Sequence, residues 1–382
     1  MNKLFRPGAK FHFMKKTLAW AEVLLIVVLA LFPLMGDVFP YRLNIFLSYE
    51  GAYRLYLGQV PYKDFGMPMG FMYWVIPALF FKIFGPAMMS LVKAQVFINI
   101  LSGLAFRAIL KNLSVTPGIR FLSVLLFVIS YSFLNYWPWY NHTVIVYEFI
   151  AIAFLTRYLF APRETRAWVW LVLSAVFVFI SFFTKQDAGA MTLLICLALL
   201  IYDAIVARRW SALVIFNVTL FITGLAFILP FIDYRFNYWF NYGQPPHSSR
   251  FSANDFIEEF FYESQWLKFY VFVILILLAG QLRNWKSFLK NQHSMIFLLL
   301  TLGIIVEAAI FQVTSYIPAD NNIFFHSFAI AYILSLLSAW LPFSFDAFKP
   351  LLMGAAGIML WWSSVYWKFV ERYIIKLTPE PI

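Results

Sequence analysis

Asp37 is the first residue of this sequence whose type and position suggest chemistry. It follows directly after an apolar run that begins at Thr17, in the phrase LMGDVFPYR. A carboxyl group at the edge of an apolar layer is partly desolvated, which raises its proton affinity toward that of a useful general base. We therefore predict Asp37 as a catalytic proton acceptor; the alternative is a solvated carboxylate that only ends a helix.

The phrase TKQDAG is a second candidate, because its polar residues stand between two apolar runs. A lysine and an aspartate kept at such a boundary are suited to bind an anionic group. We predict that Lys185, Gln186 and Asp187 contact a substrate, with Lys185 on its anionic part. The alternative is a lysine that snorkels to the interface beside its counter-ion.

The most distinctive stretch, residues 51–71, reads GAYRLYLGQVPYKDFGMPMGF, and its prolines and glycines impose sharp changes of direction. Such a turn could shape a rim for a lipid-borne substrate, with Arg54 and Lys63 meeting its phosphate. The acids Glu50 and Asp64 are the next candidates for the base. The alternative is a rigid connection without a binding role.

Two further segments complete the predicted substrate-binding set. The phrase NYWPWYNHT contributes Tyr140 and His142, and the polar stretch over residues 233–265 contributes Arg235 and Arg250. No zinc-ligand spacing, phosphate-binding glycine loop or dinucleotide fingerprint is present, so no metal ligand is assigned.

Two acids lie deeper inside apolar runs. Glu148 falls about a turn and a half into its run, where we expect a second acid or a buried structural partner. Glu307 is near the middle of its run, and a protonated, hydrogen-bonded contact between helices is the interpretation we favour there.

The composition indicates that lipid, rather than water, surrounds most of this chain. The chain is 63% hydrophobic and only 12% charged, far from the makeup of soluble domains. Its net charge of +11 comes from basic residues beside apolar runs, a pattern typical of membrane topology, so no nucleic-acid partner is expected. The single cysteine, Cys196, excludes a disulfide framework.

The apolar runs predict an all-α polytopic transmembrane bundle with about eleven spans. The predicted spans are Thr17–Met35, Met88–Leu110, Phe121–Tyr136, Thr143–Phe160, Ala167–Thr184, Ala188–Val206, Ser211–Phe231, Trp266–Leu282, Met295–Val313, Phe324–Leu341 and Leu351–Trp367. Two shorter helices, Asn44–Leu57 and Phe71–Phe84, are expected to lie on the surface within the first external loop.

Charge orients these spans. If residues 71–84 do not cross, one side carries the basic N-terminus and Lys111, Arg120, Arg163, Arg166, Arg208, Arg209, Arg283, Lys286, Lys290 and Lys349. Most acids then fall on the other side, so the N-terminus is predicted to be cytoplasmic and the long loops 36–70 and 233–265 external. Because loops carry function, we expect the active site on the external side.

Several of these residues, taken in order, resemble the polytopic GT-C glycosyltransferases, in particular the protein O-mannosyltransferase and lipid A aminoarabinose transferase group. An acid just after the first helix, Asp37, is followed by two short helices in the first loop. The phrase GQVPYKDF, residues 58–65, resembles the GxxPYxDF that links those helices, and FKIFG, residues 81–85, is similar to the exit from that region. We expect one transmembrane domain, with residues 1–210 as the GT-C-like module and 211–382 as additional helices.

The resemblance implies an inverting transfer of sugar from a polyprenyl-phosphate donor to a glycan, lipid or protein acceptor outside a bacterial inner membrane. It makes Asp37 the base and Lys185 a phosphate contact. Where many members have paired acids, Asp37 is followed by Val38, and NYWPWYNHT lacks an acidic ligand; a divalent metal is therefore left open. A lipid-linked sugar flippase or transporter and a polysaccharide ligase are the alternatives, although the internal repeats typical of transporters are not found.

Overall fold

A computed structural model describes residues 9–35, 43–132, 135–160, 166–242, 252–263, 265–282, 285–315 and 323–370. Over these residues the chain is built of helices, and its one β-type pairing is an isolated bridge between Pro61 and Phe65. The predicted all-α fold is confirmed. Helices satisfy their own backbone hydrogen bonds, which is the condition for crossing a lipid bilayer.

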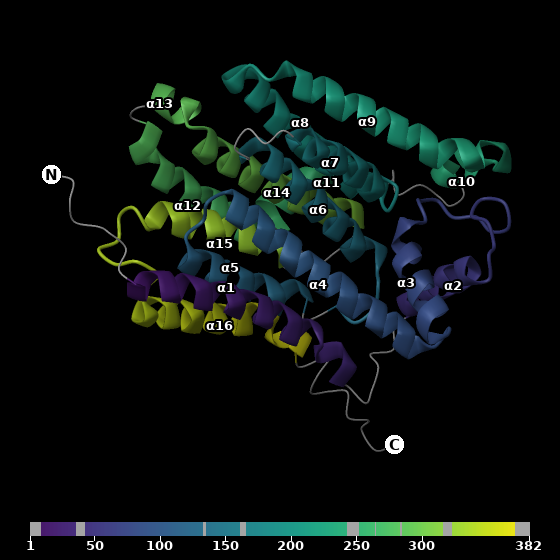
Figure 1. The fold of residues 1–382 in the computed structure, drawn as a ribbon, viewed down its shortest axis with the longest axis horizontal. Helices are drawn as coiled ribbons and strands as arrows, with labels where there is room; N and C mark the ends of the chain where they lie inside the picture. The colour runs from purple at the N-terminus through teal and green to yellow at the C-terminus, as the bar shows by residue number, and fades with distance from the viewer. Residues whose placement is uncertain are drawn as a thin grey trace.

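The longer helices form the body of the molecule (Figure 1). They are α1 (Ala9–Ala30), α4 (Met88–Asn112), α5 (Pro117–Phe127), α6 (Tyr140–Phe160), α7 (Ala167–Phe182), α8 (Gln186–Ala207), α9 (Trp210–Ile228), α12 (Gln265–Leu282), α14 (Gln292–Ser315), α15 (Ile323–Leu337) and α16 (Phe348–Val370). The short elements are η1 (Phe32–Met35), α2 (Leu43–Tyr56), α3 (Met72–Phe84), η2 (Val128–Ser132), η3 (Leu229–Tyr234), α10 (Phe236–Tyr242), α11 (Ala253–Glu258), η5 (Glu259–Glu263) and α13 (Trp285–Lys290).

Within the described residues, six helices are long and apolar enough to cross a membrane, or up to seven if the bent pair Ala253–Tyr262 and Gln265–Gly280 is one span. The six are Lys16–Leu34, Met88–Asn112, Tyr140–Phe160, Gln186–Ala207, Trp210–Tyr234 and Gln292–Thr314. Shorter apolar helices cover Met72–Phe84, Pro117–Tyr131, Ala167–Phe182 and Phe324–Leu337. The predicted total of eleven stays a prediction.

Both helices predicted in the first loop are present, as α2 and α3. The predicted span Phe121–Tyr136 differs from the observed helix at both ends. The helix starts at Pro117 and passes into a π-helical turn at Val128. Proline is favoured in the first turn of a helix, since its missing N–H has no partner to lose there.

The centre of the bundle is α6, which packs against α4 and α7, while α8 packs against α14 and α5 against α15. Large aromatic rings fill the space between these helices. Phe106 stacks on Phe127 with ring centroids 4.6 Å apart and meets Phe328 edge-on at 5.0 Å. These buried rings hold the helices in register and so fix the positions of their ends.

The two ends of the bundle differ. At one end, to the right in Figure 1, lie α2, α3 and α10; we call it the α2–α3 end. The opposite end carries α13 and the carboxyl ends of α4 and α8, where Asp203 pairs with Arg209 at 2.6 Å and accepts from Gln292 at 2.6 Å. The basic loop residue Arg209, predicted on the side of the N-terminus, therefore lies at the end away from α2 and α3.

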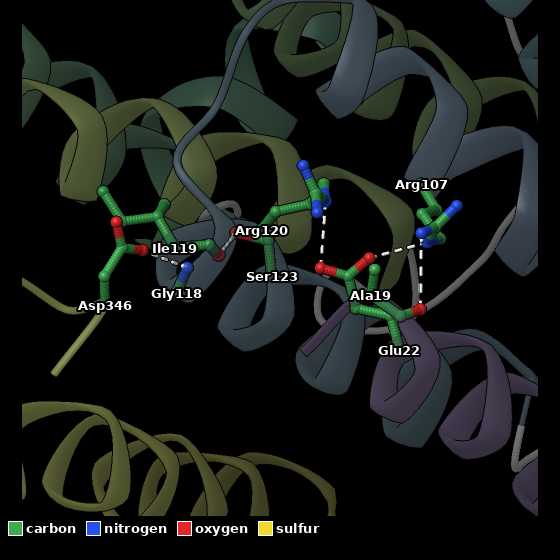
Figure 2. A network of polar contacts seen from close by, with 8 residues as sticks. All are labelled: Ala19, Glu22, Arg107, Gly118, Ile119, Arg120, Ser123 and Asp346. Atoms are coloured by element: carbon green, nitrogen blue, oxygen red, sulfur yellow. Dashed lines mark hydrogen bonds and ion pairs between the residues drawn. The ribbon is translucent and has the colours of Figure 1, made fainter. Parts of the chain in front are cut away.

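A buried ion cluster ties α1, α4 and α5 together (Figure 2). The Glu22 carboxylate is fully buried and accepts from Arg107 Nε at 2.6 Å and from Arg120 Nε at 2.9 Å. Sequence reasoning placed Arg120 in a loop and did not consider Glu22 or Arg107. In the structure Arg120 is instead a buried helical residue, because a carboxylate on a neighbouring helix compensates its charge.

Candidate functional site

Four segments that are distant in sequence meet at the α2–α3 end. The Gln186 side chain, at the start of α8, donates to the Pro68 carbonyl at 2.9 Å and to the Phe240 carbonyl at 3.1 Å. The Ser48 hydroxyl of α2 donates to the carbonyl of Pro138, just before α6. The first loop, the turn before α6, the turn before α8 and α10 are thereby brought together.

Two glycines permit this close approach. A Cβ atom on Gly70 would overlap the backbone carbonyl of Phe183, so the first loop touches the main chain of the turn that leads into Lys185. A Cβ atom on Gly51 would overlap the indole of Trp74, which packs α3 against α2. Small residues at both positions set the distance between these elements.

The phrase VPYKDF forms a tight turn between α2 and α3. The Asp64 carboxylate accepts from the Val60 backbone N–H at 2.7 Å, and the Tyr62 N–H donates to the Phe65 carbonyl at 2.7 Å. Tyr62 adopts a left-handed φ of 66°, and its buried ring meets Phe236 of α10 edge-on at 5.0 Å. Part of the role of Asp64 is therefore to hold this turn, as side-chain oxygens do in Asx turns.

A pocket of about 510 Å³ opens between α2, this turn and the start of α6. Its lining residues are Leu47, Glu50, Gly51, Arg54, Asp64, Phe65, Gly66, Met67, Pro68, Met69, Trp74 and Tyr140. Four of them belong to the predicted substrate-binding set, namely Glu50, Arg54, Asp64 and Tyr140. An aromatic wall with a few convergent polar groups is the usual makeup of a small-molecule site.

Arg54 is the cation of this pocket. Its guanidinium contacts the Glu50 carboxylate at 2.6 Å and donates to the side-chain amide oxygen of Gln59 at 3.2 Å, and it lies 5.4 Å from the centre of the Phe65 ring. The Glu50 side chain is 60% exposed and that of Arg54 35%, so the pair is hydrated and easily rearranged. Both groups can turn toward a ligand that enters the pocket.

Lys185 precedes Gln186, whose side chain is hydrogen-bonded to the Pro68 carbonyl at the edge of this pocket. Its residue is only 8% exposed, and its ammonium contacts the Asp187 carboxylate at 2.8 Å and the face of Phe311 at 4.2 Å. Burial lowers the pKa of the Lys185 ammonium, and the neighbouring Asp187 opposes that shift. The Thr314 hydroxyl donates to the same Asp187 oxygen at 2.5 Å.

A hydrogen bond joins the two parts of the site. Pro68 lines the pocket, and its carbonyl accepts the hydrogen bond from Gln186, the residue between Lys185 and Asp187. The wall of the pocket and the turn that holds Lys185 are therefore direct neighbours.

The remaining predicted residues lie outside the pocket lining. Lys63 is exposed, with its ammonium 5.5 Å from the centre of the Tyr234 ring. Arg235 is exposed after η3 with a left-handed φ of 60°, and the His142 ring packs edge-on against Tyr131. The predicted residues Asp37 and Arg250 lie outside the described residues.

Sequence reasoning missed three residues of this region. Trp74 forms a wall of the pocket, while Phe311 and Thr314 contact Lys185 and Asp187. A signal was available for Thr314, because it stands two helical turns from Glu307 and so shares its helix face. Nothing in the sequence brings α14 to Lys185, since that contact depends on how the helices pack.

Across the described ranges, no group of three or more His, Cys, Asp or Glu side chains is arranged to hold a metal ion.

Comparison of the structure with solved structures identifies the fold. Two crystal structures of ArnT from Cupriavidus metallidurans match with a TM-score of 0.55 at 12% identity, one bound to undecaprenyl phosphate and one in the apo state. The matches cover 90% and 88% of this chain, and 62% of ArnT in each case. The chain thus spans under two thirds of ArnT's length.

Sequence comparison adds nothing to this match, since no protein-family model and no curated protein matches the chain. The resemblance inferred from Asp37, GQVPYKDF and the two first-loop helices is confirmed at the level of the fold. This chain has the helical fold of ArnT.

Proposed function

We propose that this chain is a membrane glycosyltransferase that moves a sugar from a polyprenyl-phosphate donor to an acceptor. The single observation that supports this most is the pocket beside a buried lysine, in a fold shared with ArnT. The ArnT structure that matches was bound to undecaprenyl phosphate, which suggests the same class of lipid here.

The donor's phosphate is assigned to Lys185. An ammonium held in a buried site interacts with an anion far more strongly than it would in water, because little solvent screens the charge. Asp187 and Thr314 keep the ammonium in place before the donor arrives. Stabilising the charge that develops on the departing phosphate is the largest contribution we expect this site to make.

The sugar is assigned to the 510 Å³ pocket. The carboxylates of Glu50 and Asp64 can accept hydrogen bonds from sugar hydroxyls, and Arg54 can donate to them. Trp74 and Tyr140 offer ring surfaces to the apolar face of the sugar. The sugar itself would be discriminated by which hydroxyls meet these groups.

The reaction is an inverting displacement. An acceptor hydroxyl attacks the anomeric carbon, the bond from that carbon to the phosphate oxygen breaks, and the lipid phosphate leaves with the electron pair. The acceptor's proton passes to a carboxylate, a role that we assign to Asp37 on the family resemblance. The acceptor is a glycan, a lipid or a protein.

The proposed setting is a bacterial inner membrane with a cytoplasmic N-terminus and the α2–α3 end facing outward. Basic residues at the α13 end support this orientation through the excess of Lys and Arg in cytoplasmic loops. A polyprenyl donor would reach the site from the outer leaflet.

The test compares a strain lacking the protein with its parent by mass spectrometry of surface glycans and lipid A. A sugar missing from one acceptor supports the transferase and identifies donor and acceptor together. Asp37→Asn should abolish the transfer but leave lipid-donor binding intact, since only the proton acceptor is lost. A lipid-linked sugar that accumulates on the cytoplasmic side, with every transfer intact, would indicate a flippase instead.

A further inference from the structure

Two arginines share one buried carboxylate in the ion cluster of α1, α4 and α5 (Figure 2). The Glu22 side chain accepts from Arg107 Nε at 2.6 Å and from Arg120 Nε at 2.9 Å, and it is fully buried. A guanidinium group stays charged in proteins, so two positive charges meet one negative charge. The cluster therefore carries one positive charge more than its own carboxylate compensates.

The Asp346 carboxylate, which lies in the same network, does not supply the missing charge. One of its oxygens accepts from the backbone N–H of Gly118 at 2.7 Å and so caps the start of α5. The positive end of the α5 helix dipole compensates this carboxylate. Figure 2 shows the Arg120 guanidinium extending away from Asp346, and its ion pair among the described residues is with Glu22.

Both guanidinium groups keep donors that the cluster does not use. Among the described residues, Arg120 bonds through Nε alone, whereas Arg107 bonds Glu22 through Nε and the Ala19 carbonyl through one terminal nitrogen at 3.3 Å. The Arg120 side chain is only 10% exposed and that of Arg107 19%. Little solvent screens a charge in such a position, so it attracts an anion more strongly than it would in water.

The surface of α1 beside the cluster is apolar and ends in a tryptophan. Trp20, Leu24 and Val28 recur every four residues and are exposed, Trp20 to 75%. Trp20 directly follows Ala19, whose carbonyl accepts from Arg107. A tryptophan at the end of an apolar stripe is typical of the membrane–water interface, at the level of the lipid head groups. The unused donors of the cluster therefore lie near the depth of phospholipid phosphates.

We propose that Arg107 and Arg120 form a binding site for the phosphate of one anionic phospholipid. Guanidinium N–H groups match the oxygens of a phosphate, and the negative charge of the lipid compensates the excess charge of the cluster. The acyl chains lie along the exposed face of α1 that carries Leu24 and Val28. The bound lipid thereby joins α1, α4 and α5.

This site is separate from the one assigned to the sugar donor. Arg107 lies in the last two turns of α4, whose carboxyl end is at the end of the bundle away from α2 and α3. The phospholipid site therefore does not depend on the proposed transferase activity or on Lys185.

The test measures the binding of phosphatidylglycerol to the purified full chain by native mass spectrometry, with phosphatidylcholine as the lipid without net charge. The wild-type protein should bind one phosphatidylglycerol in preference to phosphatidylcholine. Arg120→Gln should weaken that binding by roughly tenfold or more, the effect expected when a charged hydrogen bond is lost. Arg107→Gln should do the same, because either variant leaves one guanidinium for Glu22 and no excess charge.

The matched control is Lys111→Gln, which removes one positive charge from an exposed position one turn along α4 from Arg107. It should bind phosphatidylglycerol as the wild type does. Arg120→Lys keeps the charge and should recover most of the binding that Arg120→Gln loses. Equal affinities in Arg120→Gln and Lys111→Gln would overturn the site, and so would equal binding of the two lipids by the wild-type protein.

Two further arms identify the occupant and the place where it binds. Inorganic phosphate should not displace the bound phosphatidylglycerol, whereas displacement by phosphate alone would overturn the assignment of a lipid in favour of a soluble anion. Lys185→Gln should retain the phosphatidylglycerol, because the two sites are separate. Its loss in that variant would place the lipid at the proposed donor site and overturn the assignment to Arg107 and Arg120.

Discussion

Gly70 of the first loop lies in backbone contact with Phe183, two residues before Lys185, and a side chain on Gly70 would overlap the Phe183 carbonyl. The relationship matters because it fixes the pocket and the buried lysine relative to each other. Neither residue carries chemistry of its own.

Gly70→Ala should therefore separate the first loop from the turn that holds Lys185. Forcing a methyl group into a filled space costs about 1–3 kcal/mol in well-packed proteins, so the thermal unfolding midpoint should fall. The affinity for polyprenyl phosphate should fall with it. Gly357→Ala is the control, since a Cβ there meets nothing within 4 Å, and it should leave both quantities unchanged. Equal behaviour of the two variants would mean that the Gly70 contact does not position the site.

Glu22→Gln should destabilise the protein strongly. The substitution leaves two guanidinium groups, Arg107 and Arg120, without their buried counter-charge, and breaking a buried pair typically costs roughly 3–5 kcal/mol. Glu50→Gln removes an exposed pair within one helix and should cost about 0.5 kcal/mol or less. Thermal unfolding in detergent compares the two, and a smaller loss for Glu22→Gln than for Glu50→Gln would contradict the structural role of the cluster.

Cysteine labelling tests the orientation in the membrane. The native Cys196 is fully buried, so the background reaction should be low. Ser248→Cys should react with an impermeant maleimide on intact cells, whereas Ser287→Cys should react only after permeabilisation. The reverse pattern would place the α2–α3 end in the cytoplasm and remove the proposed donor route.

Much of the fold could be predicted from the sequence, because a long apolar run in a membrane protein forms a helix that satisfies its own backbone hydrogen bonds. The boundaries of α2 and α8 follow from composition, and the end of α3 follows from Gly85–Pro86. The predicted span starts at Phe121, whereas α5 begins at Pro117. Proline and a charged arginine are typical of loops, and only the structure shows that the Glu22 carboxylate lies beside Arg120.

The candidate site was predicted in part. Glu50, Arg54, Asp64 and Tyr140 line one pocket. The Pro and Gly residues of the turn indicate a change of chain direction there, which is the signal that the sequence offers. The full burial of Glu148 and Glu307 could not be foreseen, since it depends on how α6 and α14 pack in the bundle. The sequence identifies each acid because a carboxyl group inside an apolar run is costly, and only the structure shows that their carboxyl oxygens have no hydrogen-bond donor among the described residues.

The binding of polyprenyl phosphate to purified protein is the most direct test of the central claim, that Lys185 holds the lipid phosphate. Lys185→Gln should weaken binding by roughly tenfold to a hundredfold, the range expected when one charged hydrogen bond is lost, while Lys185→Arg should retain most of it. Lys290→Gln, an exposed lysine at the α13 end, should bind as the wild type does. An affinity that is the same in Lys185→Gln and Lys290→Gln would contradict this assignment.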